Sequence, residues 1–282
     1  MKTIKVYTPL RYPGGKVKIY PYVKELINSN FSQPPIYVEP FAGGAGLALK
    51  LLLTGVISEI HINDFDYAIY SFWYSIINFN DKFIKTVEDT PITIETWKKQ
   101  KNIYENQSDY SLFDIGFATF FLNRTNRSGI MKAGPIGGKL QNGNYKLDSR
   151  FNKKRLVSLI KEIGMLSKNI HVYNLDAKDF IKIMDEKHPN AFFYLDPPYV
   201  TKGPGLYKNS FNEENHKVLR NAIVNLANKW FVTYDNHELI HELFSKYRIK
   251  QFELNYHAHS FKRGDEIAIY SNELLIPLST NE

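Results

Sequence analysis

One segment of the chain has the pattern of a strand, a glycine-rich loop, a helix and a second strand. An apolar run at 34–39 is followed by the loop 40–46, a helical run at 47–53 and an extended run at 59–64. Two strands joined by a helix in this way lie parallel in one sheet. The segment therefore predicts an α/β fold built on a parallel sheet.

The rest of the chain continues this pattern after a long interruption. Residues 67–123 are helical and rich in aromatic residues, and residues 124–149 are polar and glycine-rich. Strands are then expected at 170–176, 191–195, 230–234, 250–256 and 266–278, and helices at 178–187, 215–228 and 238–246. The last two strands should form an antiparallel hairpin at the sheet edge. We expect a doubly wound, Rossmann-like sheet in residues 1–74 and 156–282, interrupted by a mostly helical insert at 75–155.

Composition excludes several classes of function. The 282 residues include no cysteine, which excludes disulfides, thiolate metal sites and methylation at carbon 5 of cytosine, a reaction that needs a cysteine nucleophile. No apolar run reaches membrane-spanning length, and the first residues lack the apolar core of a signal peptide, so we expect a cytoplasmic protein without membrane contact. The eight histidines are scattered, and the pair His237 and His241 is more typical of a solvated helix face than of a zinc site. We expect no metal.

Positive charge is concentrated in one stretch of the chain. Between Glu95 and Glu162, thirteen Lys and Arg residues stand against six Asp and Glu, which accounts for the whole net charge of +7. A basic block of this kind is what binding to a phosphate backbone requires. It is equally compatible with a solvated, lysine-rich surface.

The apolar run 191–195 ends in Asp196-Pro197-Pro198-Tyr199. In open α/β sheets, ligands bind at the carboxyl ends of the strands. The Asp196 carboxylate and the Pro197 carbonyl can accept the two hydrogens of an exocyclic amino group, and the Tyr199 ring can stack on a base. The motif predicts methyl transfer to the amino nitrogen of a nucleobase, with adenine as the first choice. The alternative is that Asp196 caps a turn and Tyr199 belongs to the core.

The loop 40–46 is a candidate cofactor site. Its glycines let the backbone approach a nucleoside, and Asp64, after the next strand, can accept hydrogen bonds from ribose hydroxyls. The spacing differs from the dinucleotide fingerprint, and an ordinary strand-to-helix turn is the alternative. Lys16, in a second glycine turn, does not complete a phosphate-binding loop but can neutralise the carboxylate of a methionine-derived cofactor.

Several motifs in one order make the chain resemble the Dam-type, α-group DNA adenine methyltransferases. The matching segments are Arg11–Lys16, Val38–Gly46, Asn63-Asp64, Asn123–Gly129, Asp176, Asp196–Tyr199 and Tyr234-Asp235-Asn236, which span nearly the whole chain. The resemblance implies S-adenosylmethionine as the cofactor. The residues expected to contact it are Tyr12, Lys16, Glu39, Phe41, Gly44, Asp64, Asp176 and Asp196. Many members of the family have Trp at the position of Tyr12.

The resemblance also implies double-stranded DNA as the partner, with the target base rotated out of the duplex. The expected catalytic residues are Asp196, Pro197, Pro198 and Tyr199. The residues expected to contact DNA are Asn123, Arg124, Asn126, Arg127, Lys139, Lys153, Lys154 and Arg155. A cognate restriction endonuclease is left open as a second partner.

Four other functions are also compatible with the sequence. Cytosine N4 methyltransferases share the chemistry but more often carry Ser at the position of Asp196. Methyltransferases acting on RNA or on a protein glutamine usually carry Asn there. A catalytically inactive DNA-binding homologue would keep the fold, although the intact Asp196–Tyr199 motif and cofactor loop weaken that interpretation.

Overall fold

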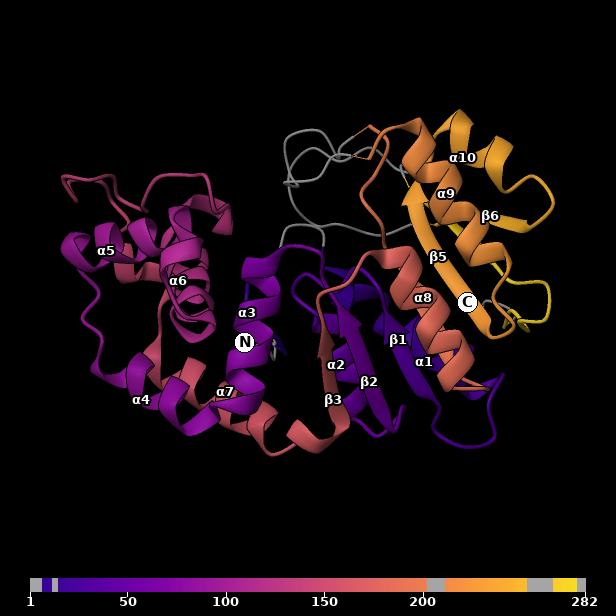
Figure 1. Ribbon diagram of the computed structural model, residues 1–282, viewed down its shortest axis with the longest axis horizontal. Coiled ribbons are helices and arrows are strands. Elements are labelled where there is room, and N and C mark those ends of the chain that lie inside the picture. Colours follow the sequence, from indigo (N-terminus) through magenta and orange to yellow (C-terminus); the bar gives the residue numbers. More distant parts are fainter. Residues whose placement is uncertain (1–6, 12–14, 202–210, 253–265, 278–282) are drawn as a thin grey trace. The chain divides into compact units, whose positions relative to one another are not determined.

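The computed structural model describes residues 7–11, 15–201, 211–252 and 266–277, and the structural statements below concern these residues (Figure 1). The chain divides into two compact units, each assembled from separate stretches. Unit 1 comprises residues 1–15, 43–49 and 65–174, and unit 2 comprises residues 16–42, 50–64 and 175–282. The proposed 75–155 recognition insert falls within unit 1.

A seven-stranded sheet has the order β3-β2-β1-β4-β5-β7-β6. Its strands are β1 (Ile36–Glu39), β2 (Glu59–Asn63), β3 (Ile170–Tyr173), β4 (Phe192–Leu195), β5 (Lys229–Asp235), β6 (Arg248–Phe252) and β7 (Glu266–Tyr270). Strands β2, β1, β4 and β5 pair in parallel, whereas β7 pairs antiparallel with both β5 and β6. This arrangement confirms the predicted doubly wound, Rossmann-like sheet.

The antiparallel hairpin predicted at the sheet edge is present, but its two strands do not both lie at the edge. β7 lies between β5 and β6, so of these two strands β6 alone lies at the edge of the sheet. β7 ends at Tyr270, earlier than the predicted 278. The part of the preceding expected strand at 253–256 lies outside the described residues.

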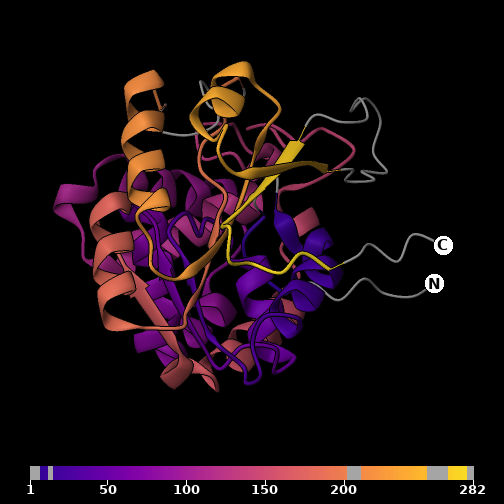
Figure 2. The same ribbon diagram turned by 90° about the vertical axis from the view of Figure 1, so that its right-hand side faces the viewer.

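Four α-helices lie in the described part of unit 2. They are α1 (Tyr20–Asn28), α8 (Ala177–Lys187), α9 (Glu213–Val224) and α10 (Glu238–Leu243). Figure 2 shows α8 and α9 on one face of the sheet and α1 on the other. Burial on both faces explains why β4 is an uninterrupted run of apolar and aromatic residues, all of them inaccessible to solvent.

Unit 1 is helical, as predicted for most of the insert. Its helices are α3 (Tyr67–Asn78), α4 (Asn80–Asp89), α5 (Ile94–Glu105), α6 (Leu112–Thr125) and α7 (Lys153–Gly164), and α2 (Gly46–Leu53) crosses the boundary between the units. Asp66 and Ser111 cap α3 and α6 with side-chain oxygens. Gly116 lets these two helices approach closely, because a Cβ there would lie 2.4 Å from the Ser71 carbonyl oxygen.

Phenylalanine rings fill the space between the helices of unit 1. Phe72 and Phe120 stack with ring centroids 5.9 Å apart, and Phe83 meets Phe120 edge-on at 5.5 Å. Phe151 closes the cluster against Phe120 at 5.4 Å. These rings provide unit 1 with its own hydrophobic core.

Helices α1 and α7 lie outside the ranges predicted to be regular structure. Pro21 lies in the first turn of α1, and Asn152 caps α7 through the Arg155 amide. β3 ends at Tyr173, before the predicted 176, because Asp176 serves as the cap of α8. Tertiary contacts and caps thus set boundaries that the apolar pattern alone could not locate.

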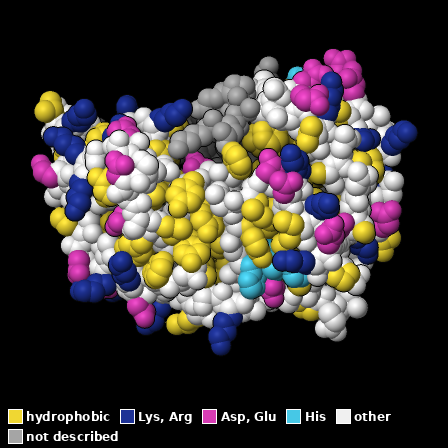
Figure 3. All heavy atoms as spheres, viewed as in Figure 1, with side chains coloured by type: hydrophobic (Ala, Val, Ile, Leu, Met, Phe, Trp, Pro, Cys, Tyr) yellow, Lys and Arg dark blue, Asp and Glu magenta, His cyan; other side chains and the backbone are white. Residues whose placement is uncertain are grey.

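Aromatic side chains of α3 form an exposed apolar patch, visible in Figure 3. Phe65, just before the helix, is 58% exposed. The rings of Tyr67, Tyr70 and Tyr74 follow one another along the helix with centroids 5.9 and 5.7 Å apart. A contiguous patch of this kind differs from the single apolar residues that are common on protein surfaces.

Among the described residues, no helix is long and apolar enough to cross a bilayer.

Candidate active site

Asp196 directly follows β4, and its two carboxylate oxygens have different surroundings. Oδ1 accepts hydrogen bonds from Thr233 Oγ1 at 2.8 Å and Tyr199 Oη at 3.3 Å, and it lies 3.5 Å from Lys16 Nζ. Oδ2 accepts no hydrogen bond from any described residue. The side chain is 21% exposed. One oxygen is therefore anchored by the protein, and the other is available to a ligand.

Lys16 lies in this site rather than on an exposed turn. It opens a short 3-10 helix (Lys16–Ile19), and its side chain is only 5% exposed. The ammonium donates to Tyr199 Oη at 2.5 Å and to Glu266 Oε2 at 2.8 Å. The described contacts of Lys16 therefore go to the Asp196 motif and to β7. Its predicted contact with a cofactor carboxylate stays a prediction.

Burial and neighbouring charges set the protonation states in the site. Burial raises the pKa of Asp196, and the Lys16 ammonium and the Thr233 hydroxyl oppose that rise. Burial, and then the Asp196 and Glu266 carboxylates, raise the pKa of Tyr199 well above its usual value. Tyr199 therefore keeps its proton at neutral pH and can donate it in a hydrogen bond to Asp196.

Glu39, the last residue of β1, is a buried acid. Burial raises the pKa of its carboxyl group well above the usual value. The neighbouring Tyr37 hydroxyl opposes that rise, and the Asp196 and Asp64 carboxylates add to it. Its Oε2 atom has no hydrogen-bond partner among the described residues. A buried polar atom without a partner is costly, and a donor on a bound ligand would satisfy it. Glu39 thus fits the expected role of binding a polar group of S-adenosylmethionine.

Asn63 links the ends of three segments of unit 2. Its amide nitrogen donates to the carbonyl oxygens of Pro40 and Leu175, each at 3.1 Å, and its amide oxygen accepts from the Leu175 amide at 2.8 Å. Its own carbonyl accepts from the Ala42 amide at 3.0 Å. The side chain thereby fixes the start of the loop after β1 beside the end of β2, where Asp64 follows.

The turn that follows adopts a tight backbone conformation. Gly43 and Ala45 both have positive φ, at 46° and 43°, and Gly44 lies buried between them. Within unit 1, Trp73 Nε1 donates to the Gly43 carbonyl at 2.8 Å. This is the strained glycine turn expected of a backbone that approaches a ligand closely.

Aromatic rings form a continuous row within unit 2. Phe41 meets Phe211 edge-on at 6.0 Å, and Phe211 meets His216 at 5.4 Å. His216 Nδ1 is hydrogen-bonded to Tyr234 Oη at 3.0 Å, and the Tyr234 ring lies 6.5 Å from Tyr199. The row leads from the start of the β1–α2 loop to the Asp196 motif. His216 and Tyr234 in its middle are buried, whereas Phe41 and Tyr199 at its two ends are partly exposed, and only such exposed rings offer a flat apolar face to a nucleobase.

Three residues of this site carried no predicted role: Thr233, Asp235 and Glu266. Thr233 and Asp235 close β5, which is parallel to β4, so both strands end at the same edge. Asp235 accepts the amides of Val200 and Thr201 at 3.0 and 2.8 Å and thereby fixes the chain after the motif. Glu266 lies opposite Asp235 in the antiparallel ladder. The carboxyl ends of the predicted strands were the signal that could have found the first two.

The remaining cofactor candidates are more scattered. Asp176 is exposed and caps α8 by accepting the Lys178 amide at 3.0 Å. Tyr12 lies outside the described residues.

The histidine pair that was weighed as a zinc site, His237 and His241, has protein partners. His237 caps α10 by accepting the Leu239 amide, and His241 Nε2 is hydrogen-bonded to Asn236 Oδ1.

Among the predicted DNA-contacting residues, the two asparagines are buried and engaged by the protein. The Asn123 amide bonds both backbone groups of Arg11 and the Gly129 carbonyl. Asn126 accepts from Trp97 Nε1 at 2.7 Å and donates to the carbonyls of Ile130 and Met131. Both side chains support the loop after α6, and the DNA contact expected of them stays a prediction.

The basic residues around this loop are of two kinds. Arg124 is mostly buried: it donates to the Arg150 carbonyl at 2.7 Å, and burial, then Arg11, Arg150 and Arg155, lower its pKa to about 10. Lys153 donates to the Glu88 carbonyl at 2.6 Å. By contrast, Arg127, Lys139, Lys154 and Arg155 are exposed. These four side chains lie at the surface, where DNA phosphates would reach them.

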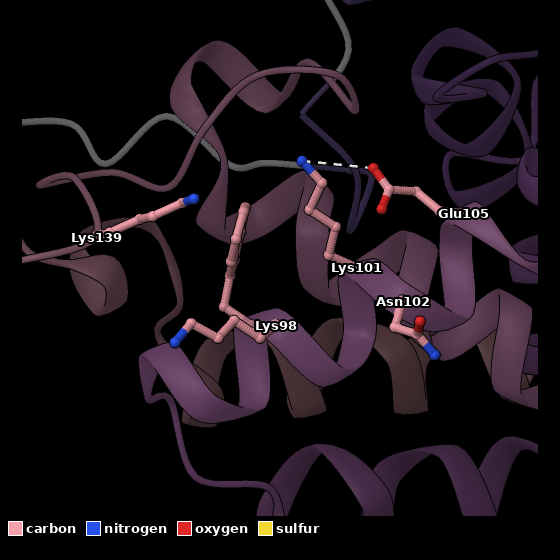
Figure 4. Close-up of a pocket in the computed structure, with 6 residues that line it drawn as sticks. Lys98, Lys101, Asn102, Glu105 and Lys139 are labelled. Carbon is pink, nitrogen blue, oxygen red and sulfur yellow. Dashed lines mark ion pairs between the residues drawn. The ribbon is translucent and has the colours of Figure 1, made fainter.

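A hollow of about 320 Å³ lies beside the loop, entirely within unit 1. Trp97, Lys98, Lys101, Asn102 and Glu105 of α5 line it together with Lys139 (Figure 4). Lys101 forms an ion pair with Glu105 at 3.5 Å and lies 5.2 Å from the Trp97 ring centroid. Three lysines and one glutamate give the hollow a positive balance, and Lys98 and Lys101 had not been singled out from the sequence.

The sheet order, the glycine turn after β1 and the acid-proline motif after β4 define a Rossmann-like methyltransferase. The chain belongs to the D12 class N6 adenine-specific DNA methyltransferase family, whose model matches residues 12–258. Membership implies S-adenosylmethionine as the cofactor and DNA as the substrate.

Two curated proteins and one solved structure are similar to the chain. The chain is 26% identical over 283 residues to the Type II methyltransferase M.CviBI of Paramecium bursaria Chlorella virus NC1A, covering 92% of this chain and 95% of that protein. It is 24% identical over 203 residues to the Type II methyltransferase M.MjaIII of Methanocaldococcus jannaschii, covering 67% and 68%. A solved structure, the rRNA methyltransferase aviRa from Streptomyces viridochromogenes, matches with a TM-score of 0.41 and 11% identity, covering 92% of this chain and 85% of that chain.

Proposed function

We propose that this protein transfers a methyl group from S-adenosylmethionine to the N6 amino nitrogen of an adenine in double-stranded DNA. The observation that carries the proposal is the Asp196 carboxylate, held through Oδ1 and open at Oδ2 at the carboxyl edge of the sheet. The family assignment supports adenine as the base.

The chemistry follows from the acceptors in the motif. Asp196 Oδ2 and the Pro197 carbonyl oxygen accept the two hydrogens of the amino group, which makes the nitrogen lone pair available for attack. When bound, S-adenosylmethionine supplies a methyl carbon on a positively charged sulfur, and the bonding electrons remain on that sulfur as the new nitrogen–carbon bond forms. The nitrogen then releases one proton to water. Tyr199 stacks on the base after it has rotated out of the duplex.

We assign cofactor binding to Tyr12, Glu39, Phe41, Gly44, Asp64 and Asp176. Two observations support this assignment: Glu39 Oε2 has no hydrogen-bond partner in the part of the chain that the structure describes, and the turn around Gly44 is strained. Lys16 acts on the Asp196 side of the site, as its hydrogen bonds indicate.

We assign DNA binding to the exposed basic side chains of the recognition insert at 75–155. Arg127, Lys139, Lys154 and Arg155 keep their predicted role, and the lysines of α5 that line the hollow join them. Arg124, Lys153, Asn123 and Asn126 support the surrounding backbone through their hydrogen bonds. The Type II relatives support a cognate restriction endonuclease as a further partner.

The first experiment is to identify the product. The protein is incubated with unmethylated DNA and S-adenosylmethionine, the DNA is digested to nucleosides, and the methylated base is identified by mass spectrometry. N6-methyladenine is the expected product. N4-methylcytosine would move the reaction to the other base, and no product on DNA together with a product on RNA would overturn the proposal.

A further inference from the structure

Glu266 is a partly buried acid of the site that belongs to none of the recognised motifs. It is the first residue of β7, its side chain is 15% exposed, and Oε2 lies 2.8 Å from Lys16 Nζ. The antiparallel register places it directly opposite Asp235, so two acids face each other on neighbouring strands. Like charges in this arrangement destabilise a sheet unless a cation or another role offsets the cost.

The Lys16 ammonium lies between Glu266 and Asp196 and interacts with both carboxylates. Nζ is closer to Glu266 than to Asp196, at 2.8 against 3.5 Å, and its contact with Asp196 is to Oδ1, the oxygen that Thr233 already binds. An ammonium that paired fully with Asp196 could bridge both carboxylate oxygens. Glu266 draws it to one side.

We propose that Glu266 is a positioning residue for the methyl transfer put forward above, on which this inference rests. It holds the Lys16 ammonium beside Asp196 Oδ1 and the Tyr199 hydroxyl, so that Oδ2 stays open to the amino group of the substrate. Without Glu266, Lys16 closes onto Asp196 and competes with the substrate for that carboxylate.

The charge balance around Asp196 gives this role a measurable signature. Among the described residues, the titratable groups that interact electrostatically with Asp196 include Lys16, Glu266, Tyr199, Glu39, Tyr37, Tyr194 and Tyr234. The Glu266 charge raises the pKa of Asp196, and Lys16 lowers it. Neutralising Glu266 therefore lowers the pKa of Asp196 in two ways. It removes a negative charge, and it lets the ammonium move closer to Asp196.

The test compares Glu266→Gln with Glu273→Gln, which makes the same chemical change at an exposed position of the same C-terminal segment. We expect Glu266→Gln to lower kcat about tenfold or more while KM for DNA and for S-adenosylmethionine changes less than about twofold. The reaction needs ionised Asp196, so the acid limb of the kcat–pH profile should move to lower pH. Glu273→Gln should match the unsubstituted protein. Unchanged kcat and an unmoved acid limb in Glu266→Gln would overturn the inference.

A second readout does not depend on activity. The Asp196 carboxyl is followed by 13C NMR during a pH titration, with Asp196→Asn used to assign the signal. A midpoint that moves to lower pH in Glu266→Gln supports the inference. If the unsubstituted protein is also inactive on adenine, that result contradicts the proposed function but not the inference about Glu266. An unmoved midpoint in a protein that does methylate adenine removes the inference alone.

The inference stays testable if Glu266→Gln fails to fold. Glu266→Asp keeps the charge but withdraws the carboxylate by one methylene, which loosens its contact with Lys16. We expect a lower kcat with a smaller shift of the acid limb, and activity equal to that of the unsubstituted protein would contradict the positioning role.

Discussion

The two carboxylate oxygens of Asp196 have different roles, which explains how one side chain can be fixed in place and still bind a substrate. Thr233 and Tyr199 supply hydrogen bonds to Oδ1 from the next strand and from the motif itself. Preorganised acceptors of this kind lower the cost of reaching the transition state, because they need no rearrangement when the substrate arrives.

Removal of the Asp196 carboxylate should separate catalysis from binding. In Asp196→Ala we expect turnover to fall by about a thousandfold or more, while DNA binding stays nearly intact. Methyl transfer is measured with labelled cofactor, and DNA binding by fluorescence anisotropy. Full activity of this variant would contradict the mechanism.

Removal of the Thr233 hydroxyl should move the pH profile in the opposite direction from Glu266→Gln. The Thr233 hydrogen bond favours ionised Asp196, so its loss in Thr233→Val raises the pKa of Asp196. Activity that requires the ionised form should then be lost at a higher pH as the solution is acidified. The kcat–pH profile checks this. The control is Thr86→Val on α4, where the hydroxyl donates to the exposed Lys82 carbonyl of its own helix. An acid limb that stays in place would show that Thr233 does not set this pKa.

At this scale, the sequence was informative where the site is contiguous in the chain. Asp196 and Tyr199 could be assigned from one tetrapeptide, and the structure brings them together with Lys16. Glu266 could not be found in the same way. Its place depends on the strand register, which a single sequence does not reveal.

At the scale of elements, Asn63 connects the ends of β2 and of the segments that follow β1 and β3. Loss of its three side-chain hydrogen bonds leaves buried backbone groups unsatisfied. We expect Asn63→Ala to lower the free energy of unfolding by about 2–3 kcal/mol, as measured by urea denaturation. Asn144→Ala, at an exposed position, should change it by less than about 0.5 kcal/mol. Equal effects in the two variants would exclude this role of Asn63.

Gly116 should reverse the usual effect of glycine in a helix. Gly→Ala inside a helix ordinarily stabilises by about 0.5–1 kcal/mol. At Gly116 the new Cβ would meet the Ser71 carbonyl oxygen at 2.4 Å, so we expect Gly116→Ala to lower the thermal midpoint. Calorimetry of the two proteins measures this midpoint. A raised midpoint would show that α3 and α6 can move apart without a loss of stability.

The element pattern was predictable wherever periodicity was strong. The parallel pairing of β2, β1, β4 and β5 confirms the parallel sheet that was predicted from one strand–loop–helix–strand segment. The insertion of β7 between β5 and β6 could not be predicted, because two adjacent strands in sequence are compatible with either order at an edge.

For the whole molecule, the uneven charge is the property with the clearest consequence. Each phosphate neutralised by a basic side chain contributes about −0.9 to the slope of log K against log salt. We expect Arg127→Glu combined with Lys139→Glu to weaken DNA binding and to flatten that slope by about 2. Lys182→Glu, an exposed residue of α8 in unit 2, makes half the charge change and should leave the slope unaltered. An unchanged slope in the double variant would move the DNA surface elsewhere.

The basic segment could be found from composition, but its active side chains could not. Thirteen cations look alike in sequence. In the structure, some of these basic side chains, such as Arg124 and Lys153, donate hydrogen bonds to backbone carbonyls. Others, such as Arg127 and Lys139, are exposed.

The hollow beside α5 gives the protein an optical reporter of its own. Of the three tryptophans, Trp97 is the one in the wall of that hollow, and the Lys101 ammonium lies 5.2 Å from its ring. Indole emission responds to nearby charge, so an anion that displaces Lys101 would shift the fluorescence spectrum. Occupancy of this surface can therefore be followed by light emitted from the unlabelled protein.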